Sequence, residues 1–253
     1  MWVDQRHQRI IELIATVGRV EADVVAVELR VSRETIRRDL MLLEGQGQLK
    51  RVHGGAVRAD PPPERPFRTR QRVQMEAKKR IARAASELVQ PGISCFIDAG
   101  TTTAAFAEAI AGIEDVLVIT NSIEIAVHLR GANAKSDVVL LGGRMALEVP
   151  ATHGELTIAE IGRHRVDLAI LSPVGIDPTA GVTYHELAEA AIARAMMEHA
   201  ARTLLLADHT KLGSISRSVI CRCEDLDTLV SDAVAERLDA YRAAGLRRVV
   251  SAG

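Results

Sequence analysis

Residues 31–40 read Val31-Ser32-Arg33-Glu34-Thr35-Ile36-Arg37-Arg38-Asp39-Leu40, and they predict a short helix in the N-terminal part of this chain. Ser32 can cap a helix, because its hydroxyl can accept from a free backbone N–H of the first turn. Ile36, Leu40 and Leu43 recur at i, i+4 and i+7, which predicts one buried stripe. The other side chains of this helix, three arginines among them, then face away from the core.

A helix with this charged face has two interpretations. Arginine offers a bidentate fork that matches guanine in the major groove, and a helix N-terminus favours phosphate. Arginine pairs alone, however, usually indicate only a solvated surface. The neighbouring sequence therefore has to decide between a DNA-reading helix and a solvated one.

The preceding segments favour a helix-turn-helix. Residues Gln5–Val17 are amphipathic and are followed by Gly18, and Glu21–Arg30 predicts a second short helix. The turn at Val31-Ser32 then leads into the arginine helix. Two short helices, a tight turn and a polar-faced third helix are typical of DNA-binding helix-turn-helix domains.

The segment Gln48–Val57 predicts a two-stranded hairpin, since Gly54-Gly55 permits the turn between two short apolar strands. This hairpin is a candidate wing that would contact the phosphate backbone. A helical domain that does not bind DNA is the alternative, and the pattern favours the winged helix. The candidate DNA-binding residues are Ser32, Arg33, Thr35, Arg37, Arg38, Lys50, Arg51 and His53.

Three motifs make the N-terminal part similar to one family. They are Arg6-His7-x-x-Ile10-Ile11-Glu12-Leu13, Thr35-Ile36-Arg37-Arg38-Asp39-Leu40 and Arg51-x-His53-Gly54-Gly55-Ala56. Together they resemble the signature of the DeoR family of bacterial transcription regulators. The resemblance covers the whole N-terminal domain, and it implies that this domain binds double-stranded operator DNA.

The composition limits the remaining possibilities. A chain of 253 residues can form one large domain or two unequal ones. Aromatic content of 2% argues against recognition of nucleic acid by base stacking. Cys95, Cys221 and Cys223 lack the spacing of a zinc site, so we expect structural thiols and no bound metal. Without an N-terminal hydrophobic signal or a long apolar run, the sequence predicts a cytoplasmic protein that does not contact a membrane.

A proline-rich, basic segment separates two parts of the chain. Residues 59–80 contain seven Lys or Arg and three Asp or Glu, and Pro61-Pro62-Pro63 excludes helix and central strand. Phe67-Arg68-Thr69-Arg70 then leads into a helix expected over Met75–Leu88. The predicted domains are therefore residues 1–58, a linker at 59–75, and residues 76–253. The basic part of the linker is either a joining helix, as in the DeoR family, or a solvated spacer.

Apolar strands and amphipathic helices alternate from residue 92 onward. This alternation predicts an α/β domain with a mostly parallel sheet covered by helices. The expected strands are Ser94–Ile97, Val116–Ile119, Val138–Leu141, Asp167–Leu171, Thr203–Ala207, Thr228–Ser231 and Arg247–Val250. The expected helices lie near Ala104–Ala111, Ile123–Leu129, Leu156–Arg163, Leu187–Ala201 and Val234–Ala244.

Small, hydroxyl or ionisable residues follow the expected strands, where open α/β sheets bind their ligands. Asp98-Ala99-Gly100-Thr101-Thr102-Thr103 predicts an anion cradle at a helix start, although an ordinary capped helix would look alike. Asp98 and Asp208 could accept from sugar hydroxyls, and Lys211 could meet a phosphate. No nucleotide-binding fingerprint is present, so we expect a small anionic, hydroxylated ligand and no cofactor.

These strand ends extend the resemblance to the sensor domain of DeoR regulators, which resembles ribose-5-phosphate isomerase in fold. The similar motifs are Asp98-x-Gly100-Thr101-Thr102, Thr120-Asn121-Ser122, Gly142-Gly143, Gly175-Ile176-Asp177, Glu189-Ala190 with Arg194-Ala195-Met196, and Asp208-His209-Thr210-Lys211-x-Gly213. The resemblance implies that the three threonines and Lys211 hold a phosphate, and that Asp98, Asn121 and Asp208 hold a polyol. The candidate effector-binding residues are Asp98, Gly100, Thr101, Thr102, Thr103, Asn121, Gly142, Gly143, Glu189, Asp208 and Lys211.

Two details refine the resemblance. Ser172-Pro173 stands where family members often have glycine, which leaves the ligand at this point open. Tyr184-His185-Glu186 and the start of the chain are similar to the glycerol-3-phosphate repressor subgroup.

The sequence therefore predicts a regulator of carbohydrate or polyol catabolism, a repressor that binds DNA as a dimer or tetramer and responds to a phosphorylated sugar or polyol. A sugar-phosphate isomerase or deaminase is the enzymatic alternative, since Asp98, Asp208, His209 and Lys211 could act as acid and base. An isomerase has no need of a DNA-reading domain, and a shared fold does not transfer activity. An architectural DNA binder without a ligand is the third option.

Overall fold

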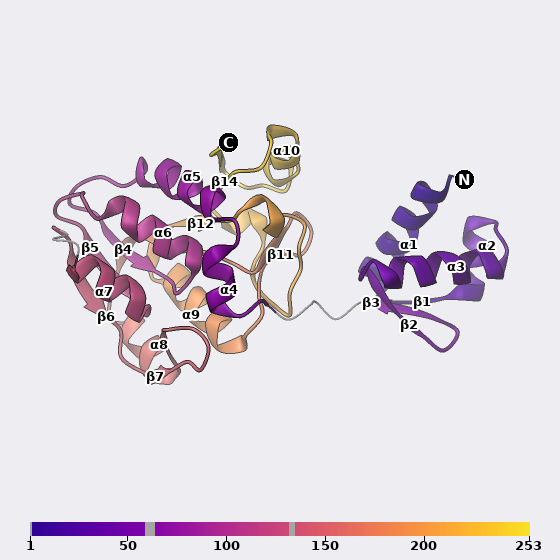
Figure 1. Ribbon diagram of the computed structural model, residues 1–253, viewed down its shortest axis with the longest axis horizontal. Helices are drawn as coiled ribbons and strands as arrows, with labels where there is room; N and C mark the ends of the chain where they lie inside the picture. The colour runs from indigo at the N-terminus through magenta and orange to yellow at the C-terminus, as the bar shows by residue number, and fades with distance from the viewer. Residues whose placement is uncertain (1, 59–63, 132–134) are drawn as a thin grey trace. The chain divides into compact units, whose positions relative to one another are not determined.

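The computed structural model describes residues 2–58, 64–131 and 135–253. The chain divides into two compact units, Met1–Pro62 and Pro63–Gly253 (Figure 1). The proline run expected to form the linker lies outside the described residues, so its conformation stays a prediction.

The N-terminal unit is a winged helix-turn-helix, as the sequence predicts. Its helices are α1 (Val3–Val17), α2 (Ala22–Leu29) and α3 (Arg33–Gly45). The wing consists of β2 (Leu49–Val52) and β3 (Gly55–Arg58). A third strand, β1 (Arg19–Glu21), pairs antiparallel with β3, so the sheet order is β1-β3-β2. Strand β1 is not predicted from the sequence, because three residues are too few to show a periodic pattern.

The stripe predicted from the arginine helix forms the core of this unit. Ile36, Leu40 and Leu43 are buried together with residues of α1 and α2. Ser32 caps α3 as expected, since its Oγ accepts from the Thr35 N–H at 3.0 Å. The predicted orientation of the charged face of α3 therefore follows from the packing of its apolar face.

A buried ionic cluster joins α1 to α3. Arg6 donates to the Asp39 carboxylate through Nε at 2.5 Å and Nη2 at 3.0 Å, and His7 Nε2 lies 3.0 Å from Asp39 Oδ1. Burial opposes the ionisation of Asp39, but the hydrogen bonds from Arg6 and His7 outweigh it, so the pKa of Asp39 lies below its usual value. This cluster holds α3 in a fixed orientation relative to α1.

The C-terminal unit is built on a seven-stranded sheet in which every neighbouring pair is parallel. Its strand order is β15-β14-β12-β9-β4-β5-β6. The strands are β4 (Ser94–Ile97), β5 (Leu117–Thr120), β6 (Asp137–Leu140), β9 (Val166–Leu171), β12 (Ala200–Leu206), β14 (Thr228–Ser231) and β15 (Arg248–Ser251). All seven were predicted, with shifts of up to three residues at their ends.

Helices cover both faces of this sheet (Figure 1). Alternate side chains of each strand contact opposite layers: Phe96 packs with α8 to α10, whereas Cys95 and Ile97 pack with α5 to α7. The helices are α4 (Phe67–Arg72), α5 (Met75–Ser86), α6 (Thr101–Ile110), α7 (Ile123–Gly131), α8 (Glu155–Ile161), α9 (Leu187–Glu198) and α10 (Ala235–Ala243).

Several predicted boundaries were wrong. The helix expected from Ala104 begins at Thr101, because Gly100 is its N-cap residue. The helix expected to reach Ala201 ends at Glu198, and β12 starts at Ala200.

Some elements were not predicted from the sequence. The segment that forms α4 was left undecided between a helix and a spacer, and the short antiparallel strands were missed. These are β7 (Arg144–Met145) with β8 (Thr152–His153), and β10 (Gly175–Asp177), β11 (Gly181–Tyr184) and β13 (Ser218–Cys221).

Within the described ranges, no helix is long and apolar enough to span a bilayer.

Asp39→Asn should destabilise the N-terminal unit by about 3 kcal/mol, because the substitution leaves the buried Arg6 guanidinium without its counterion. Hydrogen exchange should accelerate in α1 and α3 and stay unchanged in the parallel sheet. Glu34→Gln is the matched control, since it removes only the exposed ion pair with Arg38. Equal protection of α1 and α3 in wild type and Asp39→Asn would contradict this role.

Candidate functional site

The candidate DNA-binding side chains lie on α3 and on the β2–β3 hairpin. Three of the arginines are engaged by acidic neighbours: Arg33 with Asp23 at 2.8 Å, Arg38 with Glu34 at 3.5 Å and Arg51 with Glu44 at 2.6 Å. Each of these pairs is exposed, so it is weak and can be exchanged for phosphate.

Arg37, Lys50 and His53 differ from those three arginines. All three are exposed, and among the described residues none of them has an ion-pair partner. The Thr35 hydroxyl lies 2.7 Å from Ser32 Oγ, so these two predicted contact residues shape the start of α3. Arg37 on the helix and Lys50 on the wing are therefore the cations most available to a polyanion.

A second candidate site lies where the parallel sheet reverses its strand order. The chain runs from β4 outward to β5 and β6, and then from β9 on the other side of β4 to β12, β14 and β15. Open α/β sheets bind ligands at the carboxyl ends of the strands beside such a switch point. Asp98 follows β4 and Ser172 follows β9, so these two residues mark it.

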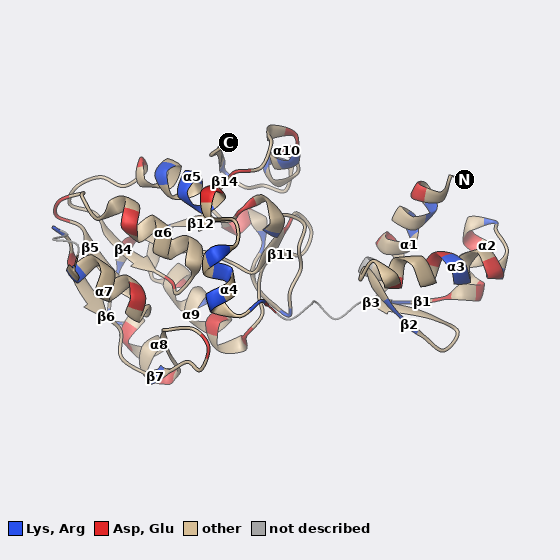
Figure 2. Cartoon of the chain, in the orientation of Figure 1, with Lys and Arg blue, Asp and Glu red and all other residues tan. Residues whose placement is uncertain are grey.

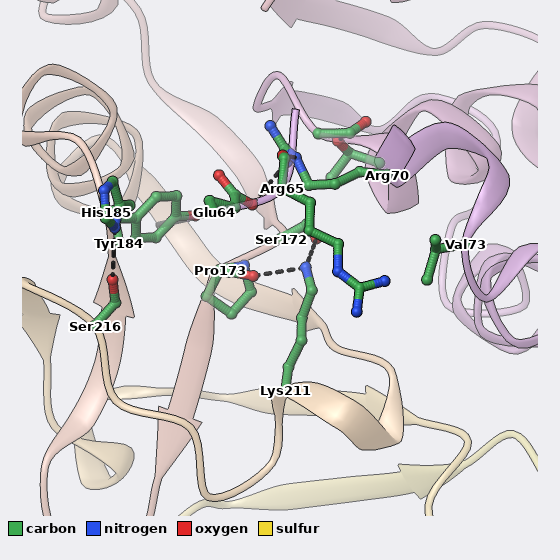
Figure 3. Close-up of polar contacts among 12 residues, drawn as sticks. Glu64, Arg65, Arg70, Val73, Ser172, Pro173, Tyr184, His185, Lys211 and Ser216 are labelled. Carbon is green, nitrogen blue, oxygen red and sulfur yellow. Dashed lines mark hydrogen bonds and ion pairs between the residues drawn. The ribbon is translucent and has the colours of Figure 1, made fainter. Parts of the chain in front are cut away.

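A cavity of about 470 Å³ opens at this edge. Strand ends, the loop before α9 and the segment before α5 all contribute to its wall. The lining residues that bear on function are Glu64, Arg65, Arg70, Asp98, Asn121, Ser172, Tyr184, His185 and Glu189. Figure 3 shows several of these side chains together with Lys211.

Asp98 is the most constrained polar group of the cavity. Its Oδ2 accepts from the Ser172 N–H at 3.0 Å and from the Tyr184 hydroxyl at 2.8 Å. Its Oδ1 is buried and has no partner among the described residues. Burial raises the pKa of Asp98 to about 6, although the bonds from Ser172 and Tyr184 act in the opposite direction.

Asn121 and Thr102 also hold buried oxygens without partners in the described part of the chain. The Asn121 amide donates to the Thr152 carbonyl at 2.9 Å, which leaves Asn121 Oδ1 unused, and the Thr102 hydroxyl has no bond. An unsatisfied buried oxygen costs about 1–3 kcal/mol. Both Asn121 and Asp98 belong to the wall of the cavity.

Other predicted effector residues have partners within the protein. Thr103 donates to the carbonyls of Asp98 and Gly100, both at 2.9 Å, and Gly142 N–H donates to Glu160 at 2.6 Å. A Cβ at Gly143 would lie 2.2 Å from Thr157 Oγ1, so glycine is required there for packing.

Asp208 and Lys211 are likewise engaged. Asp208 Oδ1 accepts from Thr210 N–H at 3.0 Å. The Lys211 ammonium donates to Ser172 Oγ at 3.0 Å and to the Pro173 carbonyl at 2.6 Å (Figure 3).

The structure thus brings three of the predicted effector residues to the cavity, namely Asp98, Asn121 and Glu189. The others do not line it: Gly100, Thr101, Thr102, Thr103, Gly142, Gly143, Asp208 and Lys211. Their assignment to a phosphate or polyol stays a prediction.

Sequence reasoning missed the contribution of the segment before α5. Glu64, Arg65 and Arg70 line the cavity, as do Tyr184 at the end of β11 and His185 in the loop that follows it. The available signal was the basic run Phe67-Arg68-Thr69-Arg70, whose arginines lie on α4 (Figure 2). The sequence alone left this run undecided, because a basic helix and a solvated spacer have the same composition.

The cavity is electrostatically mixed. Burial raises the pKa of Glu189 to about 7, and the neighbouring carboxylate of Glu64 contributes in the same direction. Burial also lowers the pKa of Lys211 below its usual value. The cavity wall itself combines carboxyl groups, which can accept from hydroxyl groups, with Arg65 and Arg70, which can bind an anionic group.

Comparisons with known proteins give a separate match for each of the two units. Residues 6–61 match the family model described as "DeoR-like helix-turn-helix domain", and residues 73–233 match "DeoR C terminal sensor domain". The glycerol-3-phosphate regulon repressor of Haemophilus influenzae is 34% identical over 87% of this chain and 85% of its own length. The repressor of the same name from Escherichia coli (strain K12) is 33% identical over 90% of each chain. A solved D-ribose-5-phosphate isomerase matches with a TM-score of 0.41 and 17% identity, over 55% of this chain and 54% of that one.

Glu189→Gln should stabilise the protein at pH 8 by roughly 1–3 kcal/mol and have little effect near pH 5. The unfolded carboxyl ionises near 4.5 and the folded one near 7, so the cost of ionising buried Glu189 grows between these values and is complete above them. Urea unfolding at both pH values measures the difference. Glu186→Gln, at an exposed neighbour in the same wall, is the control, and an equal effect of Glu189→Gln at both pH values would contradict the argument.

Proposed function

Because this chain belongs to the DeoR family of DNA-binding transcriptional regulators, we propose that it represses genes of carbohydrate or polyol catabolism until a phosphorylated effector binds. The chain is a regulator and not an enzyme. Its N-terminal unit binds DNA, and its C-terminal unit is the sensor.

The effector is a small phosphorylated polyol or sugar, and it binds in the cavity beside Asp98. The observation that carries this proposal is a pair of buried oxygens without partners among the described residues, Asp98 Oδ1 and Asn121 Oδ1, on two residues that line a cavity of about 470 Å³. Two acceptors at fixed positions suit the hydroxyl groups of a polyol. The names of the two relatives above make glycerol 3-phosphate the first effector to test.

The DNA-binding face consists of the N-terminal half of α3 and the wing. Arg33, Arg37 and Arg38 read bases or hold phosphates, and the wing residues add backbone contacts. The protein acts as a dimer or tetramer, because winged-helix regulators of this size gain affinity by occupying two half-sites at once. The effector must bind one DNA-binding state better than the other, or it could not control operator binding.

Arg37→Ala should weaken operator binding by about 1–3 kcal/mol, because its exposed guanidinium, which has no ion-pair partner in the described ranges, is available for a base or a phosphate. The operator can be obtained by selecting random DNA duplexes with the wild-type chain. Fluorescence anisotropy then compares wild type, Arg37→Ala and the control Arg130→Ala, an exposed arginine on α7. Equal affinities of all three proteins would remove Arg37 from the DNA-binding face.

Asp98→Asn should raise the effector concentration needed for half-maximal operator release at least tenfold, which corresponds to about 1.4 kcal/mol. The substitution removes the charged acceptor that a ligand hydroxyl would use. Glycerol 3-phosphate and a panel of sugar phosphates are titrated against the protein–operator complex. Asp167→Asn, which alters a carboxylate bonded to Ser94 at the opposite end of the sheet, is the control. An unchanged response of Asp98→Asn would place the effector elsewhere.

A further inference from the structure

We propose that Arg70 on α4 is the receptor for the anionic group of the effector, and that Glu64 is a built-in competitor for the same guanidinium. This inference rests on the proposed function and adds a way in which effector binding in the cavity can affect the rest of the chain.

The Arg70 guanidinium is held beside the cavity by its own segment. Its Nη1 lies 2.8 Å from Glu64 Oε1, and both side chains are only 19% exposed. Its Nε donates to the Arg65 carbonyl at 3.0 Å, and its Cζ lies 5.4 Å from the centroid of the Phe67 ring. Both Arg70 and Glu64 line the cavity, so a ligand in the cavity meets this ion pair directly (Figure 3).

Helix α4 is anchored to the sensor unit at its start. Phe67 is buried against Val149 and Ala151, with Ala99 packed beside them, and these three neighbours line the cavity themselves. This packing holds α4 as a wall of the cavity.

The far end of α4 is anchored by polar contacts. Gln71 donates to Glu124 of α7 at 2.8 Å. Lys78 is 5% exposed, and its ammonium donates to the carbonyl of Arg70 and, at 2.8 Å, to that of Val73. A buried lysine on α5 thus satisfies the last carbonyls of α4. The backbone of α4 at Arg70 is therefore held in place independently of Glu64.

Arg70 belongs to a mixed cluster of charges. Burial and then the charge of Lys211 lower the pKa of Lys78 to about 8, whereas the carboxylate of Asp208 acts in the opposite direction. Glu64 supplies the single negative charge that Arg70 contacts. A phosphate brings nearly two, and it can form two parallel bonds to a guanidinium.

This arrangement places the anionic group beside Arg70, whereas the sequence resemblance assigned it to Thr101, Thr102, Thr103 and Lys211. The polyol end keeps its predicted partners Asp98 and Asn121. Arg70 can meet an anion once Glu64 leaves, while the Lys211 ammonium would first have to give up Ser172 and Pro173.

Displacement of Glu64 from Arg70 by an anion also affects the chain before Glu64. Glu64 directly follows Pro63, and the residues before it lead to the DNA-binding unit. When the anion takes Arg70, the Glu64 carboxylate loses its partner, and the first residues of the sensor unit lose an attachment to the cavity wall. Effector binding therefore acts on the segment that connects the two units.

Two substitutions with opposite expected signs test the proposal. Isothermal titration with glycerol 3-phosphate, and with glucose 6-phosphate as a second probe, should show at least tenfold weaker binding to Arg70→Gln. Glu64→Gln should bind at least fivefold more tightly, since the competing carboxylate is gone, and a misfolded variant could not give this result. Arg68→Gln, at an exposed arginine of the same helix, and Glu76→Gln, at an exposed glutamate of α5, are matched controls that should change affinity less than twofold.

Operator affinity without effector provides the second readout. Glu64→Gln should shift it in the same direction as the effector shifts that of the wild type. Unchanged or weaker effector binding to Glu64→Gln, or unchanged binding to Arg70→Gln, would overturn the inference while leaving the proposed function intact. If the wild-type chain bound neither probe nor any other sugar phosphate, the proposed function would fail and this inference with it.

Discussion

The Ser172 N–H donates to the Asp98 carboxylate and so joins the ends of β4 and β9, where the strand order of the sensor unit reverses. This bond uses Asp98 Oδ2, and Asp98 Oδ1 has no partner among the described residues. Tyr184, at the end of β11, donates to the same Oδ2. The free oxygen therefore has a fixed position, which is what a specific contact with a ligand hydroxyl requires.

The N-terminal unit also contains a buried carboxylate, and there it positions a helix and not a ligand. Asp39 is held by Arg6 and His7, so a polar cluster in an otherwise aliphatic core sets the position of α3. The exposed cations of α3 and the wing need not contribute to stability, and three of them are loosely paired with acidic neighbours. In the N-terminal unit, the buried groups that stabilise the fold are thus separate from the exposed cations that are available to DNA.

The sequence predicted what depends on periodicity and on strand ends. The stripe of Ile36, Leu40 and Leu43 and the seven parallel strands were found because each pattern is repeated over several residues. Asp98 and Asn121 were found because ligands bind after strands. Arg70 and Glu64 were missed, because their role depends on where Phe67 anchors α4, and no local pattern encodes that long-range contact. The threonines after Gly100 were given a ligand role, although the Thr103 hydroxyl bonds to the backbone of its own turn.

The proposed function requires that operator binding and effector binding be coupled equilibria of one chain. The affinity for glycerol 3-phosphate can be measured with and without operator, and the affinity for operator with and without saturating glycerol 3-phosphate. Each ligand should change the affinity for the other by the same factor, of about five or more. Identical affinities in the presence and absence of the other ligand would contradict it.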